Sequence, residues 1–479
     1  MKTPVDPAAR GRATAIPGPG ARESLTWLKY LGSDILRTMD SLAEKYGNVS
    51  RIRIGWQSVV FVRGSDAVRH VLVANQDNYP KSNQFDLFRP ILGNGLVTSR
   101  GDTWRRSRRM VNPVFAKRNL GVYADHMAAA AADTVDTWDG APNAREIDLD
   151  GEMLRIGLDT VFRALVSHDV ADTGDDVGSL IGEALHEIGQ MSRSPAAMLL
   201  QDVKRVGIVR AARIFTPTHW RRYAGLAGRT DAVMESLVDD RLAHGHGDRN
   251  DLLALLIDSP DPTNGEKLTR TKVVDEIKTF IAAGHETTAH GLAWMFYLLG
   301  HHPTARERLE DEVDAVLGDR RLPTAADAEQ MPWLNACFLE AMRLYPPVWH
   351  IPRLAAADDV INGHQVPAGS RIMVSGWSTH RDPSVYERPT SFEPERWLDG
   401  AAADRPKFSY LPFGGGRRAC VGQGFAMLNA AILGAVVARR YRFESDPSVR
   451  IHLESTITLR PVGGFPPPRT AADTSWVPL

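Results

Sequence analysis

The segment Phe-Gly-Gly-Gly-Arg-Arg-Ala-Cys-Val-Gly, residues 413–422, is the most informative stretch of the chain. Three consecutive glycines precede Cys420, and a helical pattern begins near Gly422. Glycine lets a backbone turn sharply and approach a flat ligand closely. The start of a helix presents free amide groups and the positive end of the helix dipole to the cysteine sulfur, which favours the thiolate. Because the thiolate is the metal-binding form of cysteine, the segment predicts that Cys420 is a metal ligand.

The composition limits the class of protein. The other cysteine, Cys337, lies in the helical segment LNACFLEAM and is predicted to be a buried structural residue. With two cysteines in 479 residues, a disulfide-built secreted scaffold is excluded and a cytoplasmic location is expected. Lys plus Arg total 57 and Asp plus Glu total 58, which argues against nucleic acid as a partner. The sequence contains neither a secretory signal nor an apolar run typical of a membrane anchor.

Hydrophobic periodicity predicts a mainly helical chain with small β-sheets. Residues 1–20 are rich in proline and glycine and are expected to form a flexible lead-in, and residues 21–479 a single domain. The longest helix is predicted over residues 271–302; at about 48 Å it would cross the whole core. Further expected elements are helices over 23–46, 304–317, 332–345 and 422–441, hairpins over 49–62 and 360–374 (the second with an Asn362-Gly363 turn), a long loop over 382–416 and a strand-like segment at 456–459.

The cysteine segment also matches a known pattern. The pattern F-x-x-G-x-R-x-C-x-G resembles the heme-binding loop of the cytochrome P-450 family, and it is met by Phe413, Gly416, Arg418, Cys420 and Gly422. The resemblance implies that Cys420 is the axial iron ligand of heme b (iron protoporphyrin IX), where a thiolate favours O–O cleavage. It also implies that Arg418 pairs with a heme propionate and that Phe413 packs beside the sulfur. In the implied fold, heme lies between the long central helix and the helix that follows the cysteine.

A second motif, Ala283-Gly284-His285-Glu286-Thr287-Thr288, lies midway along the long predicted helix. Its apolar flank indicates a buried helix rather than an exposed polar face. Gly284 removes a side chain where a ligand must approach, and Thr287 offers a hydroxyl that can bind oxygen or water. Glu286 supplies a carboxylate for proton transfer. The resemblance implies that Glu286 and Thr287 deliver protons during the reduction of dioxygen, and that Ala283 and Gly284 lie against the heme.

Glu340 and Arg343 form an E-x-x-R motif, whose spacing places both side chains on one helix face. The resemblance adds Arg396, from the segment Pro-Glu-Arg-Trp at 394–397, to a buried ionic network that supports the heme-side loop. Trp397 stands where phenylalanine is more usual in the family. Breaking one member of such a network should be costly, because the remaining charges lose their partners.

Trp104 and Arg108 resemble the W-x-x-x-R motif of the family and share one face of a predicted helix. The resemblance implies that both reach the heme propionates, and that Arg353 does so as well, since guanidinium suits carboxylates. A basic surface helix is the alternative interpretation of residues 104–108.

The resemblance implies a monooxygenase that inserts one oxygen atom of O2 into a mostly apolar small molecule, by hydroxylation or epoxidation. Fatty acids, terpenoids and other natural-product skeletons of secondary metabolism all fit. Electrons are expected from a separate ferredoxin or flavodoxin with an NAD(P)H-dependent reductase, because the short segment after Cys420 leaves no room for a fused flavin or iron–sulfur domain. A basic patch would attract this partner, formed by Arg105, Arg106, Arg109, Lys117, Arg118 and Arg417.

Two alternatives remain open. One is a heme-thiolate peroxygenase or isomerase that does not reduce O2, against which the Glu286–Thr287 pair argues. The other is a non-enzymatic heme-binding protein.

The substrate pocket would, by resemblance, draw on the loop over 85–92 and on residues near the heme. The candidates are Phe280, Ala283, Val348, Trp349, His350, Ile351 and Ile457. His350 would supply one polar handle. Each of these side chains is also typical of a plain core, so the sequence does not choose a substrate.

Overall fold

The computed structural model describes most of the chain. The described residues are 13–20, 23–24, 27, 34–54, 57–139, 148–167, 177–194, 207–247, 249, 251–320, 322–398, 400, 402–443, 451–465 and 476–478. Residues 1–12 of the predicted lead-in, and most of the predicted helix before residue 34, lie outside them.

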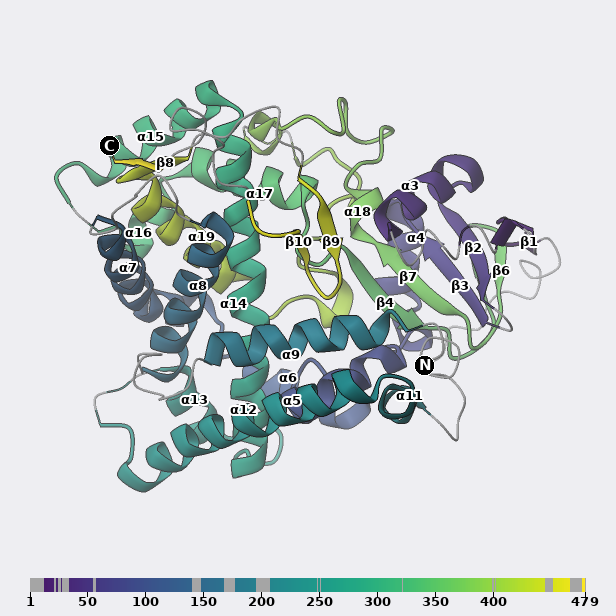
Figure 1. Ribbon diagram of the computed structural model, residues 1–479, viewed down its shortest axis with the longest axis horizontal. Helices are drawn as coiled ribbons and strands as arrows, with labels where there is room; N and C mark the ends of the chain where they lie inside the picture. The colour runs from purple at the N-terminus through teal and green to yellow at the C-terminus, as the bar shows by residue number, and fades with distance from the viewer. Residues whose placement is uncertain are drawn as a thin grey trace.

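Helix α14, Arg270–Gly300, runs through the centre of the molecule (Figure 1). The Thr269 hydroxyl accepts a hydrogen bond from the Lys272 amide and caps its start. Most of its side chains are buried, because several helices pack against it. Among them are α8 (Leu149–Val166), α17 (Pro332–Leu344) and α19 (Gln423–Ala438). The prediction of a core-crossing helix is confirmed, with an end two residues earlier than expected.

Further helices surround this core. They are α3 (Ile35–Tyr46), α4 (Ser65–Arg69), α5 (Arg89–Leu92), α6 (Gly101–Val111), α7 (Lys117–Asp139), α9 (Val177–Ser192), α11 (Gly207–Phe215), α12 (Pro217–His244), α13 (Leu252–Asp258), α15 (Pro303–Leu317), α16 (Ala325–Ala328) and α18 (Gly376–Thr379). The predicted helices over 304–317, 332–345 and 422–441 are confirmed as α15, α17 and α19. A continuous helix over 23–46 is wrong, because the backbone of Asp34 is extended (φ −152°) and its carboxylate caps the start of α3.

Small sheets complete the fold, and the largest lies at one edge of the molecule beside α3 (Figure 1). Its strand order is β2 (Val49–Ile54), β3 (Gln57–Val62), β7 (Arg371–Ser375) and β4 (His350–Leu354). The others are β1 (Thr14–Ala15) with β6 (His364–Val366) and β5 (Asp359–Ile361), β9 (Leu453–Ser455) with β10 (Leu459–Pro461), and β8 (Tyr441–Phe443) with β11 (Trp476–Pro478). The predicted fold class, mainly α with small β-sheets, is confirmed.

The predicted hairpins are partly confirmed. β2 and β3 pair antiparallel, and the Asn362-Gly363 turn joins β5 to β6 with positive φ angles of 47° and 79°. The prediction that residues up to 374 belong to the second hairpin is wrong. Strand β7 belongs to the larger sheet instead, where it pairs parallel with β3. The predicted strand at 456–459 is mostly the turn between β9 and β10.

Part of the lead-in is tied to the body of the protein. β1 is extended, as expected, but it pairs with β6, and the neighbouring Ile16 is only 2% exposed.

Candidate active site

The cysteine loop depends on glycine. Gly416 has a φ of +68°, and a Cβ at this position would lie 1.9 Å from the carbonyl oxygen of Leu72. Gly414 also has a positive φ, of +72°. The loop then returns, so that the Cys420 amide donates a hydrogen bond of 2.8 Å to the Phe413 carbonyl, just before α19 begins. The segment quoted at the outset therefore folds as a tight loop that presents Cys420 at the start of a buried helix.

Cys420 and the middle of α14 share an unusual property. Cys420 is exposed, and Ala283 is exposed although Ile281 and Ala282 before it are buried. Thr287, one turn further along the helix, is half-exposed. Accessible surface on otherwise buried elements is what a bound flat group would cover, so these residues fit a heme between α14 and the cysteine loop.

The predicted lowering of the Cys420 pKa is wrong for the heme-free chain. The Cys420 side chain has accessible surface but is recessed among protein atoms, and this desolvation raises the pKa of its thiol, although the Gly422 amide and the Arg108 guanidinium act in the opposite direction. The thiolate therefore depends on a further positive charge at the sulfur, which a coordinated metal ion supplies.

A group of cations lies next to the loop. Arg418 stacks over the Trp104 ring at 4.3 Å, and its buried Nη1 has no hydrogen-bond partner among the described residues. Arg353 is buried, and burial together with Arg418 lowers its pKa to about 10. Within the described ranges, neither arginine forms an ion pair with a carboxylate. A buried guanidinium group at Arg353 and a partly buried one at Arg418, neither with a carboxylate partner among the described residues, fit the two propionates of heme.

Sequence reasoning missed two more members of this group, Lys81 and Arg100. Burial and the charges of Arg418, Arg353 and Arg100 lower the pKa of Lys81 to about 6. The Lys81 ammonium donates to the carbonyls of Leu96 and Val97, at 2.8 and 2.6 Å. Arg100 pairs with Asp86 at 2.6 Å. No motif marks Lys81 in the sequence, because an isolated β-bridge to Arg353 brings it here.

Trp104 and Arg108, the predicted pair on α6, also contact the cysteine loop. Trp104 is buried beneath Arg418, and Arg108 Nη1 donates a 2.7 Å hydrogen bond to the carbonyl of Ala419, next to the cysteine. The alternative of a purely basic surface helix does not describe these two side chains.

The two polar residues of the α14 motif point to different partners. Glu286 is buried and accepts a 2.9 Å hydrogen bond from the Thr458 hydroxyl, in the turn between β9 and β10. Burial raises its pKa. The Thr287 hydroxyl donates to the carbonyl of Ala283 at 2.8 Å. The Glu286 carboxyl is therefore buried and held by Thr458, and Thr287 occupies the helix face that carries the exposed Ala283.

Gly284 lies where α14 packs against α8. A Cβ at Gly284 would lie 3.4 Å from Cγ2 of Val161 on α8, an ordinary van der Waals distance. The predicted place of Gly284 against the heme stays a prediction.

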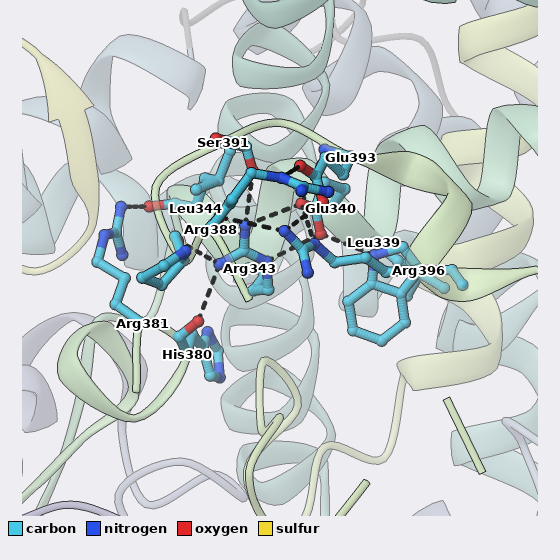
Figure 2. A network of polar contacts seen from close by, with 12 residues as sticks. Leu339, Glu340, Arg343, Leu344, His380, Arg381, Arg388, Ser391, Glu393 and Arg396 are labelled. Carbon is cyan, nitrogen blue, oxygen red and sulfur yellow. Dashed lines mark hydrogen bonds and ion pairs between the residues drawn. The ribbon is translucent and has the colours of Figure 1, made fainter. Parts of the chain in front are cut away.

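The predicted ionic network is assembled as expected (Figure 2). Arg343 donates to both oxygens of Glu340, at 2.9 and 2.8 Å, and both side chains are fully buried. Arg396 lies 3.4 Å from Glu340. Arg343 also donates to the carbonyls of His380, Pro389 and Ser391, which hold the long loop after α18.

Trp397 belongs to the same network. Its indole N–H donates a 2.9 Å hydrogen bond to Glu340, in addition to the 3.0 Å hydrogen bond from the Glu393 amide. Phenylalanine, the more usual residue, has no such donor. The departure from the family pattern therefore adds a hydrogen bond to a buried carboxylate.

The predicted pocket residues divide into two sets. Phe280 contacts Phe115 edge-on at 5.3 Å, and Ile351 and Ile457 are half-buried. Burial lowers the pKa of His350 to about 4, so its imidazole is neutral at pH 7. Their place in the substrate pocket stays a prediction.

The second set consists of Trp349, Val348 and the loop over 85–92. Trp349 packs into the core cluster under the largest sheet, and its indole N–H donates to the Thr456 carbonyl at 3.3 Å. Val348 is 41% exposed. The predicted loop over 85–92 lines an outer hollow of about 910 Å³ opposite α11, with Asp86, Arg89 and Arg100 on one wall.

The mainly helical fold, the glycine-built cysteine loop and two arginines that have no carboxylate partner in the described ranges define a heme-thiolate protein. Comparison with known proteins agrees. The sequence profile described as Cytochrome P450 matches residues 17–465. The chain belongs to the cytochrome P450 family, and it is a cytochrome P450 monooxygenase with heme as its cofactor.

Named relatives are similar over nearly their whole length. Cyclooctatin synthase of Streptomyces melanosporofaciens is 32% identical over 98% of this chain and 99% of its own. Cyclooctat-9-en-7-ol 5-monooxygenase of the same organism is 32% identical over 85% of this chain and 84% of its own. The crystal structure of the cytochrome P450DA heme domain shares the fold, with a TM-score of 0.81 over 94% of this chain and 96% of that one at 22% identity. Within the part of the chain described above, none of the helices combines the length and apolarity needed to span a lipid bilayer.

Proposed function

We propose that Cys420 binds the iron of heme b and that Arg418, Arg353 and Lys81 hold the propionates. The observation that carries this assignment is that the buried Arg353 and the partly buried Arg418 have no carboxylate partner among the described residues, beside a loop that only glycine can form. Trp104 supports Arg418 from below, and Arg108 fixes the backbone next to the cysteine.

The reaction combines RH, O2, two electrons and two protons to give ROH and water. Bound heme supplies the activation of O2. Glu286 holds a proton at its carboxyl group, and Thr287 presents its hydroxyl on the same stretch of α14. The buried flanks of α14 keep bulk water away, so that protons arrive through side chains. This division of tasks distinguishes a monooxygenase from a peroxygenase, which has no need to deliver protons to O2.

The assignment is tested by the reduced, carbon monoxide-bound difference spectrum of the purified protein, beside Cys420→Ala and, as a matched control, Cys337→Ala. We expect the red-shifted Soret band of thiolate-ligated heme in the parent and the control, and its loss in Cys420→Ala. A histidine-type band in the parent would overturn the assignment.

The substrate is proposed to be a mostly hydrocarbon skeleton that carries a hydroxyl group, as cyclooctat-9-en-7-ol does in the name of one relative. Phe280 and Ile351 offer apolar contacts, and neutral His350 can exchange a hydrogen bond with an alcohol. Spin-shift titrations with this alcohol and with its deoxygenated hydrocarbon test the idea. We expect His350→Phe to weaken binding of the alcohol about tenfold and to leave the hydrocarbon unchanged. Equal losses for both compounds would contradict a role for His350.

Electrons are proposed to come from a separate ferredoxin or flavodoxin. The predicted basic patch is built from ion pairs: Arg105 with Asp102, Arg106 with Glu266, Arg109 with Asp261, Lys117 with Glu329 and Arg417 with Asp77. The side chain of Arg118 lies outside the described residues. An acidic partner therefore has to compete with these carboxylates, which favours a salt-sensitive, transient encounter.

Arg417→Glu is the sharper charge reversal, because Asp77 is exposed whereas the Asp261 partner of Arg109 is buried. We expect slower reduction at low salt, with Arg221→Glu on α12 as control. An unchanged rate with every tested ferredoxin and flavodoxin would exclude this docking surface.

A further inference from the structure

A buried cluster of ionisable side chains lies where α8 begins beside α14. His290 is fully buried and follows Glu286 by one helical turn, so the two side chains share a face of α14. Asp150, in the first turn of α8, is 9% exposed. Its Oδ1 lies 3.6 Å from His290 Nε2. Asp150 also interacts electrostatically with Glu286.

Asp150 and His290 have unsatisfied hydrogen-bonding groups within the described part of the chain. Asp150 Oδ1 and both ring nitrogens of His290 have no hydrogen-bond partner among the described residues. Leaving buried polar atoms unpaired costs about 1–3 kcal/mol each, so the pair is a poor device for stability alone. A shift of about 1 Å brings Asp150 and His290 to hydrogen-bond distance.

The outer end of the cluster reaches the protein surface. Asp148, the residue before α8, is exposed and adds its charge to the surroundings of Asp150. The positive charge of Arg460 on β10 acts on Asp150, His290 and Glu286. The Arg460 side chain itself forms an ion pair with Glu454 at 2.8 Å. Asp150 therefore stands between the accessible acid and the buried histidine.

We propose that Asp150 and His290 are positioning residues that resupply Glu286 with protons from the surface at the start of α8. The inference rests on the proposed role of Glu286. Each proton that leaves the Glu286 carboxyl is replaced by one from His290. The imidazole loses that proton from one ring nitrogen and gains another from Asp150 at the other, and Asp150 is reprotonated from solvent. No group is oxidised or reduced in this transfer.

The protonation states suit this task. Burial lowers the pKa of His290 to about 3, with smaller contributions from Arg460 and His285, so the ring is neutral and carries one N–H and one lone pair. Burial and the charges of Asp148 and Glu286 raise the pKa of Asp150 to about 7, and Arg460 opposes them. A carboxyl group that is half-protonated at neutral pH can both accept and release a proton.

The test compares Asp150→Asn and His290→Phe with Glu187→Gln. Glu187 is a matched control, since it is a buried carboxylate that contacts a histidine, His219 at 2.5 Å, between α9 and α12. We expect both cluster variants to lower product formation at least about tenfold. They should also divert electrons to hydrogen peroxide and change the solvent isotope effect. Asp150→Glu should restore the rate, and Glu187→Gln should stay within about twofold.

A second readout does not depend on turnover. Infrared spectra of the resting protein should contain a carboxylic-acid C=O band that titrates near pH 7 and is missing in Asp150→Asn. Absence of this band, or parent-like product formation and isotope effect in both variants, would overturn the relay. Failure of the proposed role of Glu286 is distinguishable, because Glu286→Gln would then keep parent-like product formation and solvent isotope effect.

Discussion

Trp397 stands where the family resemblance leads one to expect phenylalanine, and Trp397→Phe tests whether its indole N–H supports the buried network. The change keeps an aromatic ring beside Tyr410 and Arg405. The Trp397 and Tyr410 ring centroids are 4.3 Å apart, and Arg405 Cζ lies 4.2 Å from the Trp397 ring centroid. It removes the 2.9 Å hydrogen bond to Glu340. Glu340 keeps Arg343 as its ion-pair partner, so the loss is one hydrogen bond and not a stranded charge.

The expected loss follows from these contacts. A hydrogen bond to a charged group is worth about 1.5–3 kcal/mol, so we expect the free energy of unfolding to fall by about 2 kcal/mol. Unfolding entropy is about 2.1 cal/mol/K per residue, which for this chain of 479 residues gives about 1 kcal/mol/K. The melting temperature should therefore fall by about 2 °C.

The assay is scanning calorimetry at one fixed scan rate, together with urea unfolding followed by heme absorbance. The matched control is Trp333→Phe. Trp333 donates a 2.9 Å hydrogen bond to the neutral carbonyl of Ala305 and also carries an arginine over its ring, Arg308 at 3.7 Å. The free energy of unfolding of Trp333→Phe should fall by only about 1 kcal/mol. An unchanged melting temperature in Trp397→Phe, or equal losses in the two variants, would refute the assigned role of the indole.

Three further outcomes are expected. Gly416→Ala should destabilise the protein by at least about 2 kcal/mol in urea unfolding, because a positive φ and a clash combine there, whereas Gly228→Ala on α12, with open space around it, should be neutral or slightly stabilising. Arg418→Leu should speed heme loss to a scavenging apoprotein about tenfold or more, while the exposed neighbour Arg417→Leu should not. Burial raises the pKa of Asp150 from 3.8 to about 7, so the folded state binds more protons in this range and stability falls as pH rises from about 4 to 7; Asp150→Asn should flatten this slope in urea midpoints.

Much of the site could be predicted because the backbone geometry of a short segment depends on its own residue types. The glycines before Cys420 predicted a loop that other residues cannot form, and the positive φ of Gly416 agrees. The spacing of Glu340 and Arg343 predicted one helix face, and the buried bidentate pair agrees. In each case a short segment carries its own geometry, so its neighbours in the fold are not needed to interpret it.

Other features depend on segments far apart in the chain. Lys81 joins the cations of the heme side because a bridge places it next to Arg353, and neither residue's surroundings in the sequence indicate the pairing. The neighbour of Gly284 is equally distant in the sequence, since a Cβ at this position would meet Val161 on α8. In both cases the partner lies on another element, so only the packed structure identifies it.

The same reasoning explains why the surroundings of Glu286 could not be predicted. Its role as an acid was suggested by the motif, but its raised pKa comes from burial and its hydrogen bond comes from Thr458, on a turn near the end of the chain. Along α14 the accessible Ala283 is followed within two turns by the buried Glu286 and His290. The motif names some of these residues, and only the packing of α8 against α14 shows which of them are buried.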